Sequence, residues 1–289
     1  MLTLLGWIIV TLSIIGGFMY SGGHPGHLFV LGEYMIILGV VLGYVIGASP
    51  MPVLKMMLNK SLQVLKGSPY TKEAYLDLIK VFYELLMIAR EQGVVGIEEH
   101  VMNPHQSTIF GKYPTFNHNH HAVEFMQDAL KPIIDGRLKP EQLKESLTHA
   151  IDRLYGHNAH PVAILTKASD ACPAVGIVAA VLGIVITMSY IAGEKALIGE
   201  KVAHALVGTF LGLLVSYGYM QPLIAKIEFL NEDELAYFEV MSNIIISYAS
   251  GAPPIMAAEV GRHAVPDDRK LSAEELEKLL KEMLRKPAS

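Results

Sequence analysis

The sequence predicts an all-α integral membrane protein with four transmembrane helices, a large helical cytoplasmic domain between spans 2 and 3, and a cytoplasmic C-terminal helix. Hydrophobic residues make up 52% of the 289 residues, and the mean hydropathy is +0.37. Four apolar stretches each carry at most one charged side chain, and each is long enough to cross a hydrocarbon core of about 30 Å. The net charge of −5 argues against a nucleic-acid partner.

The first two spans lie at the N-terminus. Met1 to Tyr20 contains no charged side chain and shows neither the basic start nor the small-residue cleavage site of a secretory signal, so we expect an uncleaved first span. Ser21 to His27 is a turn by its Gly and Pro content, and Leu28 to Ala48 forms the second span.

Glu33 is the single acid of the second span. A carboxylate within a span is energetically costly and is by default a candidate for an ion path. Its place near the outer end also allows the side chain to reach interfacial water or the mouth of a pore. Glu33 is therefore a candidate outer ion-path acid, and both interpretations stay open.

The basic residues predict the orientation. Of the 23 Lys and Arg residues, 13 lie between Lys55 and Lys167, eight lie from Lys226 onward, and two lie in the loop between the last two spans. Positive residues favour the cytoplasmic side, so both termini are expected there. The predicted domains are residues 1–49 (spans 1 and 2), 50–170 (cytoplasmic helical domain), 171–225 (spans 3 and 4) and 226–289 (cytoplasmic C-terminal helices and tail).

The middle segment is predicted to be helical. Thr71 to Gln92 alternates apolar and charged faces at helical spacing, which indicates an amphipathic helix that Gly93 ends. A second helix begins near Ile97 and breaks at Asn103–Pro104. Pro140 to Leu154 forms a further helix.

The C-terminal part follows the same logic. Ile224 to Tyr248 continues the fourth span as an acidic amphipathic helix, and the run from Gly251 to Pro254 ends it. A capping box formed by Ser272 and Glu275 then starts a surface helix.

Spans 3 and 4 form a hairpin lined by small residues. Cys172 to Ala192 and Val202 to Ala225 contain no Asp, Glu, Lys or Arg. At spacings of three or four they carry Gly176, Ala180, Gly183 and Thr187 on the third span, and Ala205, Gly208, Gly212 and Ser216 on the fourth. Such seams let helix backbones approach closely. They predict either contact with helices of another chain or packing of the hairpin onto its own neighbours.

Two prolines mark the same end of this hairpin. We expect Pro173 to open the third span, because proline is readily accommodated in the first helical turn. Pro222 lies inside a continuing helical pattern, where it removes a backbone hydrogen bond and favours a kink. Since consecutive spans are antiparallel, both prolines should lie at one membrane depth.

Enzyme and metal chemistry are not indicated. The sequence shows no Ser/His/Asp arrangement, no phosphate-binding loop and no acid midway along a span. Cys172 is the one cysteine and excludes an internal disulfide. His118, His120, His121 and Glu124 could suggest a metal site, but adjacent His residues point in different directions and no further ligands support them, so we favour a solvated polar loop.

The hairpin resembles a known family. The runs from Asp170 to Gly183, from His204 to Gly212 and from Tyr217 to Pro222 closely resemble the third and fourth spans of MotA-type flagellar motor stator subunits, of the MotA/TolQ/ExbB proton channel family. The resemblance extends to Glu99–Pro114 and Ile255–Arg262.

This resemblance implies a role in bacterial motility at the inner membrane. In such stators a ring of the four-span subunit, a pentamer by family expectation, encloses a MotB-type single-span partner that carries the proton-binding Asp. Inward proton flow then drives rotation of the flagellar rotor. The small-residue seams would face the enclosed helices. The resemblance assigns the ion path and its gating to Asp170, Pro173, Ala180, Thr209, Tyr217 and Pro222.

Arg90 and Glu98 match the positions through which such subunits touch the rotor protein FliG. A plain structural role is the alternative. Arg90 in the last turn of one helix and Glu98 in the first turn of the next each complement a helix dipole, worth about 0.3–1 kcal/mol.

The coupling ion is expected to be a proton, with no other cofactor, and sodium is the less favoured ion. Sodium-driven relatives carry a hydroxyl residue seven positions after the first proline, where this chain has Ala180, although Thr209 remains. The alternative functions are a TolQ/ExbB-type energiser and a non-motile ion-driven membrane scaffold.

Overall fold

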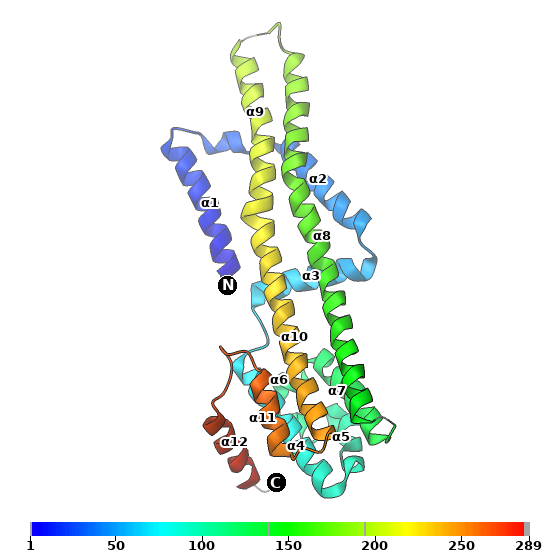
Figure 1. The fold of residues 1–289 in the computed structure, drawn as a ribbon. Helices are drawn as coiled ribbons and strands as arrows, with labels where there is room; N and C mark the ends of the chain where they lie inside the picture. The colour runs from blue at the N-terminus through cyan, green and yellow to red at the C-terminus, as the bar shows by residue number, and fades with distance from the viewer. Residues whose placement is uncertain (1, 138, 194, 286–289) are drawn as a thin grey trace. The chain divides into compact units, whose positions relative to one another are not determined.

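A computed structural model describes residues 2–137, 139–193 and 195–285, and within these ranges the regular structure is entirely helical (Figure 1). Four helices of the described part are long and apolar enough to cross a membrane. They lie in Leu2–Tyr20, Pro25–Ala48, Pro140–Met188 and Lys195–Ala249. The predicted fold class, with four spans and a large helical region between the second and third, is confirmed.

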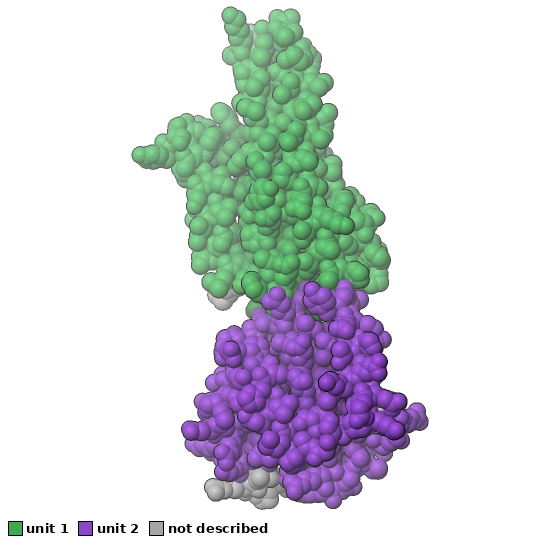
Figure 2. Space-filling view, in the orientation of Figure 1, with its two compact units in different colours: residues 1–67, 158–230 green, residues 68–157, 231–289 purple. Residues whose placement is uncertain are grey.

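The chain forms two compact units (Figure 2). The first unit comprises residues 1–67 and 158–230, and the second comprises residues 68–157 and 231–289. The predicted domain limits at residues 50, 171 and 226 follow the ends of the apolar stretches, whereas these units follow the contacts that the helices make. Segments 51–67 and 158–170 therefore group with the spans.

The first unit begins with α1 (Leu2–Tyr20), the short 3-10 helix η1 (Pro25–Leu28) and α2 (Leu31–Ala48). Helix α3 (Met51–Lys66) follows, which the sequence analysis did not anticipate. It runs across the direction of the long helices in Figure 1 and contacts α1.

The third span is longer than predicted. The predicted helix at Pro140–Leu154 and the third span are one continuous helix, α8 (Pro140–Met188). Pro161 and Pro173 lie inside it, so the prediction that Pro173 opens a helix is wrong. A proline costs a helix one hydrogen bond without ending it when the turns on both sides are stabilised by packing.

The fourth span is interrupted without a break in the chain direction. Helix α9 (Lys195–Leu213) continues into η5 (Leu214–Met220), which is a π-helix, and then into α10 (Gln221–Ala249). Figure 1 shows α9 beside the last turns of α8, joined by a short loop.

The second unit is built around α4 (Lys72–Gln92). The Thr71 hydroxyl caps its start by accepting a bond from the N–H of Ala74 at 3.3 Å, and Gly93 ends it with φ +79°. Short helices cover α4: η2 (Val94–Ile97), α5 (Glu98–Met102), η3 (Pro104–Gln106), η4 (Phe110–Lys112), α6 (Pro114–Asn117) and α7 (His120–Ile134). Phe82, Phe110 and Phe116 form the aromatic centre of this core.

The C-terminal helices complete that unit. Helix α11 (Pro254–Ala264) packs against α4, and α12 (Ala273–Arg285) buries Leu276 and Leu280 in the same core. The predicted capping box is confirmed: Ser272 N–H donates to Glu275 at 2.8 Å, and Glu275 N–H donates to the Ser272 hydroxyl at 3.1 Å.

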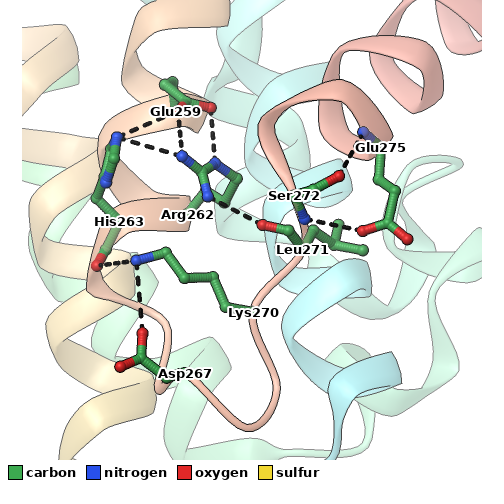
Figure 3. A network of polar contacts seen from close by, with 8 residues as sticks. All are labelled: Glu259, Arg262, His263, Asp267, Lys270, Leu271, Ser272 and Glu275. Carbon is green, nitrogen blue, oxygen red and sulfur yellow. Dashed lines mark hydrogen bonds and ion pairs between the residues drawn. The ribbon is translucent and has the colours of Figure 1, made fainter.

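A polar network links α11 to the segment before α12 (Figure 3). The buried Arg262 pairs with Glu259 at 2.5 Å and donates to the carbonyl of Leu271 at 2.9 Å. Lys270 donates to the carbonyl of His263 at 3.2 Å. Because Arg262 is 7% exposed, these bonds satisfy a charge that would otherwise be buried without partners.

Candidate functional site

Glycine holds the hairpin of α8 and α9 together. A Cβ atom at Gly176 would lie 2.7 Å from the carbonyl oxygen of Gly208 and 3.1 Å from Cα of Gly212. A Cβ atom at Gly183 would lie 2.7 Å from Cβ of Ala205. These separations are shorter than side chains adopt, so the two backbones can touch here only because these residues are glycine.

The small residues were predicted either to contact helices of another chain or to pack the hairpin onto its own neighbours, and the glycines do the latter. They are covered by the facing helix of the same hairpin, so the prediction that they face an enclosed partner helix is wrong. Larger side chains point outward instead. On α8 these are Ile177, Val178, Val181 and Val185, each more than half exposed.

The prolines change the backbone at two neighbouring turns. Pro173 has no N–H to donate to the carbonyl of Ser169, four residues earlier in α8. Pro222 has no N–H to donate either, and it follows the π-helix η5, in which the N–H of Gln221 donates to the carbonyl of Ser216. The irregularity predicted near Pro222 thus takes the form of a seven-residue π-helix, a feature common at functional sites.

Polar side chains tie η5 to its neighbours. The hydroxyls of Ser169 and Ser216, both fully buried, lie 3.1 Å apart. From α1, Trp7 Nε1 donates to the carbonyl of Tyr219 at 3.2 Å, and the hydroxyls of Thr11 and Tyr219 lie 2.8 Å apart. From sequence, Ser216 was named only as a small residue of the seam, and Trp7, Thr11, Ser169 and Tyr219 were not singled out. Their signal was the occurrence of the single Trp and of hydroxyl residues within spans, where polar groups need partners.

The residues assigned to the ion path fall into two groups. Ala180 is 8% exposed and Thr209 is half-buried, and a Cβ atom at Gly176 would lie 3.3 Å from Cα of Thr209, so both belong to the glycine-packed part of the hairpin. Asp170, Tyr217 and Pro222 are exposed, and Pro173 is half-buried. The structure does not bring these two groups into one cluster.

Glu33 lies in a slot on the same hairpin. The residue is 6% exposed, and its Oε2 has no hydrogen-bond partner in the described part of the chain. A Cβ atom at Gly208 would collide with Oε2, and a Cβ atom at Gly183 would lie 3.4 Å from Oε1. Within this chain the carboxyl group is therefore enclosed, which argues against the alternative that it reaches interfacial water.

Arg90 and Glu98 lie on either side of the turn at Gly93. Arg90 is in the last turn of α4 and Glu98 begins α5, as predicted, and both are exposed. Neither forms an ion pair with another described residue. Burial raises the pKa of Tyr83 and Tyr248, and the positive charge of Arg90 acts in the opposite direction on both. The positive charge of Arg90 therefore acts on these two neighbouring tyrosines, and its exposed side chain is accessible to a binding partner.

The histidine-rich segment takes a different form from the predicted loop. His120 and His121 begin α7, with Asn119 capping it, and their side chains are exposed. Over the described ranges, no group of three or more His, Cys, Asp or Glu side chains is arranged to hold a metal ion.

Comparisons with known families match nearly the whole chain. Residues 4–93 match the family described as motility protein A N-terminal, and residues 117–240 match the MotA/TolQ/ExbB proton channel family. Chemotaxis protein LafT of Vibrio parahaemolyticus is 33% identical over 96% of this chain and 98% of its own length. Motility protein A of Salmonella typhimurium is 31% identical over 96% and 94%.

Solved structures share the fold. The Campylobacter structure described as C. jejuni MotAB superposes with a TM-score of 0.77 and 22% identity, over 94% of this chain and 98% of that one. The flagellar MotAB stator complex of Bacillus subtilis gives a TM-score of 0.72, also with 22% identity, over 96% and 98%.

Proposed function

Because the chain belongs to the MotA/TolQ/ExbB proton channel family, in its motility protein A branch, we propose that it is a stator subunit of the flagellar motor. In this proposal it surrounds a MotB-type single-span partner and converts inward proton flow across the inner membrane into rotation. Solved relatives that share its fold are MotAB complexes, which supports a partner of this type. It is a multi-pass inner-membrane protein, and the Lys and Arg distribution supports cytoplasmic termini.

The observation that favours a motor stator over a TolQ/ExbB-type energiser is the match of residues 4–93 to the motility protein A N-terminal family. This segment includes both first spans and reaches Arg90 and the end of α4. Energisers have three spans and lack a segment of this form, so the match favours the motility branch.

The proposed mechanism uses the two proline turns. Protonation of an aspartate on the partner removes the cost of burying its charge, and one charge crossing 100 mV releases about 2.3 kcal/mol. That energy is enough to bias two arrangements of similar stability. The turns at Pro173 and Pro222 are joined through Ser169 and Ser216, so a shift at one is felt at the other. Arg90 and Glu98 would then press on charges of the rotor protein FliG.

The test is complementation of a strain without stators. The full chain, expressed with the one-span protein encoded beside it, should restore swimming, whereas the same pair with the partner's membrane aspartate changed to asparagine should not. A five-membered ring around the partner is expected by native mass spectrometry of the purified complex. Assembly of that complex without any restored swimming or proton uptake would contradict the proposed function.

A further inference from the structure

We propose that the Glu33 carboxyl group is itself a proton-binding group of the ion path, so that this chain supplies a protonation site beside that of its partner. The inference rests on the proposed function, and it starts from the slot between α2, α8 and α9.

The first step is the burial of an unpaired acid. Glu33 is more than nine-tenths buried, and Oε2 accepts no hydrogen bond from a described residue. Burying a carboxylate without a donor costs several kcal/mol, and a group in such a place takes up a proton instead. A structural role for Glu33 would show the opposite pattern, with both oxygens paired as in the Glu259–Arg262 pair.

The second step is the shape of the slot. Gly208 leaves space that Oε2 occupies, and a Cβ atom there would also lie 3.0 Å from Cδ of Glu33 and 3.1 Å from Cβ of Ala179. Ile37, one helical turn after Glu33 in α2, forms an apolar cluster with Ala179, Val207 and Leu211. The carboxyl group therefore lies against Gly208 and Gly183 and next to hydrocarbon side chains.

The third step is its depth. Gly208 is the chain neighbour of Thr209, and Ala179 is the chain neighbour of Ala180. Glu33 therefore lies level with the two hairpin positions assigned to the ion path, on the face that α2 covers. Because a helix with its side chains is about 10 Å across, the hairpin alone separates this carboxyl group from a partner enclosed on its other face.

The fourth step is the absence of a fixed countercharge. Helix α8 carries no charged side chain from Ala171 to Met188. On the other elements around the slot, the titratable residues closest in sequence to Glu33 and Gly208 are His27 in η1, Tyr34 in α2, and Lys201 and His204 in α9. Nε2 of His204 lies 4.0 Å from Oε1 of Glu200. Sodium would need several oxygen ligands, which this slot of glycine and aliphatic side chains does not offer, so the proton is the ion that fits.

The proposed step changes one bond. A proton adds to Oε2 of the Glu33 carboxylate and forms an O–H bond. On release that bond breaks, the proton passes inward to an ionised carboxylate on the partner, and Glu33 returns to its charged form. Nothing is oxidised or reduced.

The first experiment measures protonation directly. Dicyclohexylcarbodiimide reacts with protonated carboxyl groups in apolar surroundings, so the complex in liposomes is treated at pH 7 and the adducts are located by peptide mass spectrometry. Modification is expected at Glu33 and not at Glu200, whose side chain is 59% exposed. No adduct at Glu33, or protection of Glu33 by sodium at constant pH, would overturn the proposal.

The second experiment measures conduction by the same complex. Glu33→Gln should lower potential-driven proton uptake by about 100-fold or more, the range expected for loss of a proton-transfer group. Glu33→Asp should retain part of it, and the control Glu200→Gln should match wild type. If Glu33→Gln takes up protons at the wild-type rate, this inference is overturned and the proposed function is not affected.

The proposed function and this inference can fail separately. A wild-type complex that takes up no protons would contradict the proposed function, and carbodiimide labelling would still decide whether Glu33 holds a proton. If Glu33→Gln does not assemble, wild-type complex labelled to increasing extents replaces it. The adduct on the partner's membrane aspartate is quantified in the same samples. At equal labelling of that aspartate, uptake should fall in proportion to the adduct at Glu33, and unchanged uptake at full labelling of Glu33 would overturn the inference.

Discussion

The hydroxyl oxygens of Ser169 and Ser216 lie 3.1 Å apart, so a buried hydrogen bond joins α8 to the π-helix η5. Ser169 is the residue whose carbonyl Pro173 leaves without its helical donor. Ser216 lies in η5, and its carbonyl accepts from the N–H of Gln221, the residue before Pro222. The bond therefore connects the turn at Pro173 to the π-helix that precedes Pro222.

Removing either hydroxyl should weaken this connection. Ser169→Ala is expected to lower the free energy of unfolding by about 1–3 kcal/mol, because the Ser216 hydroxyl stays buried without its partner. Ser216→Ala should cost less, because the Ser169 hydroxyl keeps the carbonyl of Ser216 as an acceptor at 3.5 Å. The double variant should cost less than the sum. Thermal unfolding of the purified chain in detergent measures this, with the exposed Ser13→Ala as a control. Strictly additive losses would show that the two hydroxyls do not interact.

Charge reversal should separate rotor contact from ion flow. Arg90→Glu and Glu98→Lys are expected to abolish or strongly reduce swimming, because both exposed charges would then repel their partners on the rotor. Proton uptake by the complex in liposomes should be unchanged. Pro173→Ala should have the opposite pattern, because it should reduce proton uptake by the complex in liposomes. Swimming that survives both charge reversals would leave Arg90 and Glu98 with their helix-dipole role only.

The coupling ion can be tested in swimming cells. Replacing external sodium by potassium at constant pH should leave motor speed unchanged, since Ala180 offers no oxygen ligand for a dehydrated cation. Lowering the proton-motive force with an uncoupler should slow the motor. Ala180→Thr places a hydroxyl oxygen at this position, and its motor speed in sodium and in potassium is compared with that of the wild type. A pronounced slowing of the wild type in potassium would indicate a sodium motor.

The glycine contacts of the hairpin predict a large cost for one methyl group. Gly212→Ala would place Cβ 2.5 Å from the carbonyl oxygen of Cys172 and 3.0 Å from Cα of Gly176, and should destabilise the chain by about 1–3 kcal/mol. Gly199→Ala, in the same helix, meets nothing within 4 Å and serves as the control. It should be neutral or stabilising, because alanine favours helix. Equal thermal midpoints for the two variants would contradict the observed packing.

The network of Figure 3 predicts a loss of stability in acid. The hydrogen bonds from Arg262 hold the pKa of Glu259 below its ordinary value of 4.5, with burial acting in the opposite direction. A lowered folded-state pKa gives stability that is fully present above the unfolded value and is lost as the pH falls through the folded one. The thermal midpoint should therefore fall below about pH 4.5, with the slope set by how many such carboxyls protonate.

Glu259→Gln isolates the contribution of that pair. It should lower stability at pH 7 by about 2 kcal/mol, the value of a charge-assisted hydrogen bond, and should reduce the acid dependence of the midpoint. The exposed Glu91→Gln is the control. An unchanged acid slope in Glu259→Gln would show that other carboxyl groups cause the loss.

Much of the fold was accessible from sequence because its signals are local. The apolar runs gave the spans, Thr71 and Gly93 gave the limits of α4, and Ser272 with Glu275 gave the start of α12. The continuity of α8 was not accessible, because Pro161 and Pro173 carry the local signal of helix ends and only packing of the flanking turns overrides it. Helix α3 was missed because its apolar face is short and follows a span directly.

In the candidate site, too, the residues could be proposed from sequence, whereas the contacts between them could not. Glu33, Ala180 and Thr209 were identified from residue type and resemblance, but the contact of Glu33 with Gly208 joins positions 175 residues apart, and spacing within one segment carries no information about it. The direction of the glycine seam was equally inaccessible. A small residue favours close approach without specifying which helix approaches.

The seam also restricts how the hairpin can move. Sliding α9 along α8 by one residue would bring Leu211 or Leu213 to the place of Gly212, where the carbonyl oxygen of Cys172 and Cα of Gly176 leave no room for a side chain. A slip of one residue is therefore sterically blocked, so α8 and α9 are expected to tilt together as one stiff unit rather than to slide by single residues.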